Sequence, residues 1–188
     1  MRIEVHVHGD IFLTRSTTRT DIETALQPLL DYLDVDTPEE ATSLYSEEPG
    51  IALDRGRRIL EICWSGYIGR SFQQCLEQAL LALGPCTERA SEVTASLYHD
   101  NGENETRVFF VGPTSESIRG AQRQRMVEDV GLLLSRQFTK EAVDEVVALV
   151  NQLFERDSGS AAVGLRWESH PAAPAAPGSP ARGRKRLH

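Results

Sequence analysis

The sequence predicts an α+β fold, with a small mixed or antiparallel sheet of about four strands and helices on one face. Three observations support this fold class. Some segments alternate apolar and polar residues as half-buried strands do, and others repeat apolar residues at the helical period. An Asn-Gly turn at residues 101–102 also joins two strand-like segments, as in a β-hairpin. The predicted element order is β-α-β-α-β-β-α-α, within a single domain at residues 1–157.

The N-terminal segment predicts a strand followed by a helix. Residues 1–9 place isoleucine and valine on one side and glutamate and histidine on the other, which is typical of a strand with one buried face. Thr20 and Glu23 match a capping box, and the apolar stripe from Ile22 to Leu33 has helical spacing. Pro28 lies inside this stripe and predicts a kink or an irregular turn, because proline removes a backbone donor.

The middle of the chain combines an irregular segment with its most regular one. Residues 34–58 are irregular, and the acidic stretch at 34–48 suits a solvated surface loop or a loop that covers a site. A short helix over residues 38–45, with proline first, is compatible with it. Residues 59–64 then predict a strand and residues 65–70 a turn. Ser71 predicts the N-cap of a helix that ends at Gly84.

The C-terminal half predicts a hairpin and two long helices. Residues 91–100 and 106–111 are strand-like segments on either side of the Asn-Gly turn. Helices are predicted after a cap at Thr114 or Ser115 and after Thr139, and each carries a long apolar stripe. A sheet of about four strands is small to cover the apolar stripes of both helices. We therefore expect a homodimer that forms through the C-terminal helices.

The charge pattern separates an acidic body from a basic tail. The net charge is −8, and residues 158–188 carry five basic residues and one acidic residue. The body therefore carries −12, which argues against nucleic-acid binding by any part other than the tail. The tail is rich in proline and alanine and predicts disorder. The sequence shows no apolar run of membrane-helix length and no signal-peptide pattern, so we expect a cytoplasmic protein without a membrane partner.

One short motif is a candidate metal site. His6, His8 and Asp10 share one face of the predicted first strand, so their side chains could bind one divalent metal. The His-x-His pattern resembles the metal-binding strand of amidohydrolase-type metalloenzymes, and the resemblance covers only these residues. A complete site needs further ligands from later strands, and His99 is the one further histidine in the predicted domain. The alternative is that both histidines are solvated residues on a polar strand face.

A second motif is a candidate anion site. Gly69, Arg70 and Ser71 come directly before a predicted helix. Free N–H groups at a helix start, together with a guanidinium and a hydroxyl, suit a phosphate or another anion. A tight turn followed by a capped helix explains the same residues without a ligand.

A row of arginines is the third candidate. Arg119, Arg123 and Arg125 lie on the first of the two long C-terminal helices, and the first two are one turn apart. This row could receive an acidic partner. It could equally be a solvated helix face that pairs with nearby carboxylates such as Glu116 and Glu128.

The sequence contains no pattern that specifies a catalytic class. Cys63, Cys75 and Cys86 are odd in number and form no C-x-x-C pair, so we expect buried free thiols. The sequence therefore predicts a non-enzymatic binding or regulatory protein, without a cofactor, that acts through protein–protein contacts and self-associates. The alternative is a small metal-dependent hydrolase with one divalent metal on the His-x-His strand, assisted by His99.

Overall fold

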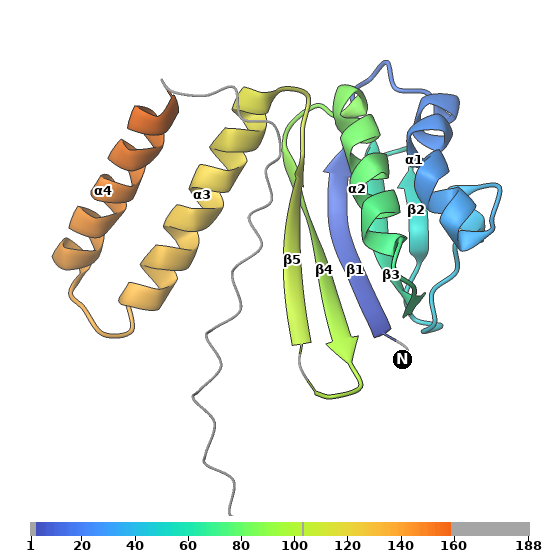
Figure 1. Ribbon diagram of the computed structural model, residues 1–188. Coiled ribbons are helices and arrows are strands. Elements are labelled where there is room, and N and C mark those ends of the chain that lie inside the picture. The colour runs from blue at the N-terminus through green and yellow to red at the C-terminus, as the bar shows by residue number, and fades with distance from the viewer. Residues whose placement is uncertain (1–2, 103, 159–188) are drawn as a thin grey trace, which may run out of the picture.

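The computed structural model describes residues 3–102 and 104–158, and the predicted α+β fold class is confirmed in them (Figure 1). The sheet has five strands rather than about four, all antiparallel, in the order β2-β3-β1-β4-β5. The strands are β1 (Ile3–Phe12), β2 (Gly50–Asp54), β3 (Ile59–Ile68), β4 (Ser91–His99) and β5 (Asn104–Val111). The α-helices within the described residues are α1 (Arg19–Leu33), α2 (Phe72–Leu83), α3 (Ser115–Leu134) and α4 (Lys140–Ser158). The predicted tail at 158–188 lies outside the described residues except for Ser158.

Strand β1 is the centre of the sheet, because β3 and β4 pair with it on either side. Its alternate residues Val5, Val7 and Ile11 are buried, and helices α1 and α2 cover this face (Figure 1). The register places Val7 between Trp64 and Ala95, which are also buried. Because strand side chains alternate, the intervening polar residues of all three strands lie on the opposite, open face.

Helix α1 begins earlier than the sequence predicted. Its N-cap is Thr18, which forms a reciprocal capping box with Asp21, so the predicted Thr20–Glu23 box is wrong. Both pairs have the same S/T-x-x-acid pattern, and the chain uses the one that begins the helix two residues earlier. The helix continues through Pro28 to Leu33, and its predicted apolar stripe packs in the core.

Strand β2 was missed by the sequence prediction because it is a five-residue edge strand inside the irregular acidic segment. It begins at Gly50, where φ is +80°, a conformation that glycine adopts without strain. A Cβ there would lie 2.4 Å from the carbonyl oxygen of Ala41. The residues before β2 can therefore fold back closely, and a 3₁₀ turn at Pro38–Glu40 takes the place of the short helix.

Strand β3 extends to Ile68, so the predicted turn at residues 65–70 is wrong over its first four residues. Gly66 leaves room for the Trp64 ring inside the strand, because a Cβ at this position would lie 2.5 Å from that ring. The same ring stacks on Phe72 of α2, with centroids 5.7 Å apart. The glycine that resembled a turn residue therefore lets an indole lie flat between the sheet and a helix.

Helices α3 and α4 form an antiparallel hairpin beside edge strand β5 (Figure 1). Thr114 caps α3 as predicted. Neither α3 nor the described part of α4 contains a buried residue, whereas α1 and α2 each bury five. The hairpin is thus attached to the domain along one side and leaves much apolar surface in solvent.

The packing at Gly66 leads to a stability prediction. We expect Gly66→Ala to lower the free energy of unfolding by about 1–3 kcal/mol, because the new methyl group must displace a packed indole ring. Gly120→Ala is the matched control, since a Cβ there meets no atom within 4 Å and alanine favours a helix. Urea unfolding of both variants measures the difference, and equal effects would contradict this role of Gly66.

Candidate functional site

The open face of the sheet carries most of the residues that could take part in binding or catalysis. In register across β3, β1 and β4, Ser65 lies beside His6 and Ser96 lies on its other side. One row further along, His8 lies between Cys63 and Thr94. These rows follow from the pleat, because residues paired across antiparallel strands point to the same face.

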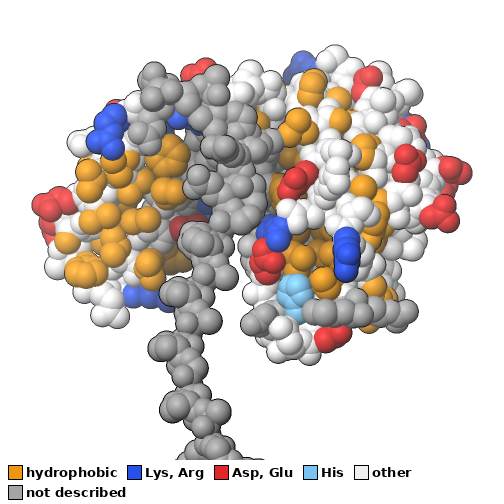
Figure 2. Space-filling view, viewed as in Figure 1, with side chains coloured by type: hydrophobic (Ala, Val, Ile, Leu, Met, Phe, Trp, Pro, Cys, Tyr) orange, Lys and Arg blue, Asp and Glu red, His pale blue; other side chains and the backbone are white. Residues whose placement is uncertain are grey.

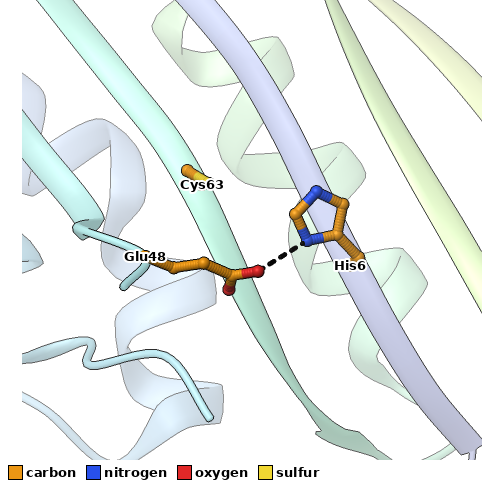
Figure 3. A group of neighbouring side chains, drawn as sticks. All are labelled: His6, Glu48 and Cys63. Atoms are coloured by element: carbon orange, nitrogen blue, oxygen red, sulfur yellow. Dashed lines mark ion pairs between the residues drawn. The ribbon is translucent and has the colours of Figure 1, made fainter. Parts of the chain in front are cut away.

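Three side chains of different types converge on this face (Figure 3). His6 comes from β1, Cys63 from β3 and Glu48 from the segment before β2. Their possible ligand atoms all lie within 4.8 Å of one another. His6 Nδ1 is 3.3 Å from Glu48 Oε1, and the two side chains are 34% and 15% exposed. The group therefore combines an imidazole, a carboxylate and a thiol in a half-buried position.

The segment that supplies Glu48 is fixed to the end of β3 by hydrogen bonds. The Trp64 indole N–H donates to the carbonyl of Thr42 at 3.0 Å. The Ser65 backbone N–H donates to Ser43 Oγ at 2.9 Å, and the Leu44 N–H donates to the Ser65 carbonyl at 2.8 Å. Residues 42–44 of the acidic 34–48 segment are therefore held against β3, and this placement brings Glu48 over the open face.

Hydrogen bonds hold the Glu48 carboxylate in its ionised form. Burial by itself would raise its pKa, but hydrogen bonds from the hydroxyls of Ser43 and Ser65, with the nearby His6, lower the pKa overall. The pKa of the Cys63 thiol is raised, first by burial and then by the charges of Glu48 and Glu61. The group thus contains a carboxylate whose charged form is favoured and a thiol whose charged form is disfavoured.

The arrangement is not the proton relay of a serine hydrolase. His6 Nδ1 is 2.9 Å from Ser65 Oγ and also faces Glu48, whereas a relay needs the two ring nitrogens to contact different groups. Ser65 is only 1% exposed, so a substrate cannot reach its hydroxyl. The imidazole, carboxylate and thiol of this group are all residue types that bind metal ions.

The structure divides the metal ligands predicted from the sequence. His8 and Asp10 do share the open face with His6, yet His6 groups with Glu48 and Cys63 instead. The His8 ring stacks parallel to the His6 ring with centroids 6.3 Å apart. His99 pairs with Ile3 and therefore lies on the other face of the sheet, so it does not join His6. Cys63 belongs to the open face rather than to the core, and all three cysteines are half-buried and free.

The residues of the predicted anion site are exposed, but one of their backbone donors already has a hydrogen-bond partner. The Gly69 N–H donates to the Tyr32 hydroxyl at 2.6 Å, so this backbone donor already has a partner. Ser71 occupies the predicted N-cap position, but its side chain makes no capping hydrogen bond. Gly69, Arg70 and Ser71 all remain exposed.

The arginine row is split by the tertiary structure. Arg125 forms ion pairs with Glu92 of β4 at 2.6 Å and with Asp129 at 2.9 Å, so it anchors α3 to the sheet. Arg119 and Arg123 form no ion pair with residues that the structure describes. All three arginines are exposed or half-exposed, so it is the ion pairs of Arg125 that separate it from Arg119 and Arg123.

The second candidate surface consists of exposed apolar side chains on the α3–α4 hairpin. Figure 2 shows apolar side chains gathered over these two helices. The exposed members are Met126, Leu132, Leu133, Phe138, Val146, Leu149 and Leu153. Monomeric domains seldom expose so many large apolar side chains on one pair of helices, and such surfaces mark interaction sites. We call these residues the hairpin patch.

The lowered pKa of Glu48 leads to a pH prediction. A carboxylate with a lowered pKa stabilises the fold at neutral pH, and this contribution is lost as the pH falls through the folded-state pKa. Glu48→Gln should therefore be less stable than wild type at pH 7, and the difference should shrink below about pH 4. Unfolding free energies from pH 7 to pH 3 test this, and a pH-independent difference would contradict it.

Comparisons with known proteins place the chain in a family. No curated protein and no solved structure matches it. Among the described residues, no helix is both long and apolar enough to cross a membrane. One family model, a family of unknown function named DUF6806, matches residues 3–155. This range contains the sheet, the open-face group and nearly all of the hairpin, and the protein therefore belongs to this family of unknown function.

Proposed function

We propose that the protein is a self-associating protein-binding module whose contact surface is the α3–α4 hairpin. The observation that carries the proposal is the hairpin patch, on two helices that bury no residue in the described chain. Among the described elements, α4 packs chiefly against α3. Most helical stability in proteins comes from the packing of an apolar face, so a second neighbour would stabilise α4.

Helix α4 carries more apolar surface than α3 covers. Val143, Val147 and Phe154 are half-buried along one stripe, as expected for the side that faces α3. Val146, Leu149 and Leu153 form a second stripe at spacings of three and four residues, and they are 38%, 54% and 40% exposed. A helix with two adjacent apolar stripes and one neighbour requires a second neighbour.

A second copy of the chain is the occupant that fits this surface. Two antiparallel hairpins related by a two-fold axis form a four-helix bundle, in which each hairpin covers the other with the same residues. Met126 and Leu133 lie two turns apart on α3 and extend the apolar surface beyond α4. Asp144 lies on the opposite side of α4 from the second apolar stripe, so the centre of that stripe suits an apolar partner.

Substitution in the centre of the patch tests self-association. We expect Leu149→Glu to weaken the dimer by about 2 kcal/mol or more, roughly 30-fold in dissociation constant, because it places a charge in an apolar interface. Leu153→Glu should act in the same direction. Sedimentation velocity across a concentration series measures the change.

Leu81→Glu is the matched control for this experiment. Leu81 is 61% exposed on α2, so the substitution introduces the same charge at an exposed leucine outside the hairpin. It should leave the oligomeric state of wild type unchanged. A wild-type protein that stays monomeric at all accessible concentrations, or equal effects of the substitutions at 81 and 149, would rule out the proposal.

The remaining functional expectations stay predictions. A metal-dependent hydrolase on the His-x-His strand loses His99 as a ligand, since that residue lies on the other face of the sheet. Neither the cytoplasmic location nor a regulatory role follows from the hairpin patch. Nucleic-acid contact through the basic tail involves residues outside the described part of the chain.

A further inference from the structure

We propose that His6, Glu48 and Cys63 form a binding site for one Zn²⁺ ion on the open face of the sheet. This site is independent of the hairpin patch, because its residues come from β1, β3 and the segment before β2. It also differs from the His6-x-His8 pattern in the sequence, since a thiol and a carboxylate replace His8 and Asp10.

The ligand set has the composition of a zinc site. Zinc binds imidazole nitrogen, thiolate and carboxylate oxygen, and softer sulfur ligands favour it over magnesium or calcium. Two ligands of one tetrahedral zinc ion lie roughly 3.5 Å apart when the bonds are about 2.0–2.3 Å long. His6 Nδ1 and Glu48 Oε1 are 3.3 Å apart, and all the ligand atoms lie within 4.8 Å. Small side-chain rotations therefore suffice to complete three bonds.

The surroundings orient the ligands and leave an entry path. Ser43 and Ser65 each donate a hydrogen bond to the Glu48 carboxylate, which is the outer-shell support that ligating carboxylates have in metal sites. His6 is 34% exposed, so a metal ion can enter from solvent and a water molecule can take the fourth position. The Ser65 contact to His6 Nδ1 would be replaced by the metal bond.

Charge also favours a cation at this position. Glu48 supplies a carboxylate to the group, and Glu61 lies beside Asp10 on the same open face. Binding releases the proton of the Cys63 thiol, because the thiolate is the form that bonds to the metal.

Cobalt titration tests the proposal directly, since Co²⁺ reports thiolate coordination through a charge-transfer absorption band. The full chain is reduced, stripped of metal with a chelator and titrated with Co²⁺, and Zn²⁺ is then added. We expect a thiolate band that saturates at one Co²⁺ per chain and disappears when Zn²⁺ displaces it. Zinc should also raise the melting temperature of wild type.

Single substitutions identify the ligands. Cys63→Ser should abolish the thiolate band, and Cys63→Ser and His6→Ala should each weaken zinc binding by at least about 100-fold. Ser43→Ala should keep the band and weaken binding by about 10- to 100-fold, because Ser43 orients Glu48 without touching the metal. Cys63→Ser is nearly isosteric, so circular dichroism should show an unchanged fold.

Cys75→Ser and His99→Ala are the matched controls, since they remove the same residue types from α2 and from the other face of the sheet. Both should bind metal as wild type does. Absence of a thiolate band in wild type would overturn the proposal. Equal zinc affinity in wild type and Cys63→Ser would also overturn it, because Cys63 would then make no bond to the metal. Failure here would leave self-association untouched, because the two experiments use separate residues and readouts.

Discussion

The pairing of β1 with both β3 and β4 is the constraint on which the rest of this structure depends. It fixes one register across three strands, and the register assigns each side chain to one of two faces. Val5, Val7 and Ile11 thereby meet α1 and α2, while His6 and His8 face away from them. A slip of one residue would exchange the two sets, so the burial of the apolar face also determines where the polar chemistry lies.

The open-face group shows how a docked segment changes the chemistry of a strand. His6 alone would be a half-exposed imidazole on a polar surface. The hydrogen bonds of Thr42, Ser43 and Leu44 to the end of β3 bring Glu48 beside it, and the pleat brings Cys63. Three residues that are 15 to 57 positions apart in the chain thus become neighbours. The serines that hold the segment before β2 also orient the carboxylate.

The hairpin and the sheet differ in how completely their apolar residues are covered by the rest of the chain. The sheet, α1 and α2 enclose a continuous core between them. The hairpin is tied to that body through α3, in part by the pair of Arg125 with Glu92, and its own apolar residues stay exposed. Self-association would complete the packing of the hairpin, and the proposed metal site would form on the open face, so the two proposed properties can vary independently.

The sequence by itself determined most of the elements and the buried faces of β1, β4 and α1. The alternation in β1 and β4, the stripe of α1 and the cap at Thr114 are local signals, because propensity and periodicity act over a few residues. The local signals were ambiguous where two patterns competed, as with the two capping boxes before α1 and the glycine at 66. Only the tertiary structure decided that Gly66 makes room for Trp64, that β2 closes the sheet edge and that Arg125 belongs to the domain rather than to a partner. It also decided that His6 meets Glu48 and Cys63 instead of His99, because strand order and register depend on contacts between residues far apart in the chain.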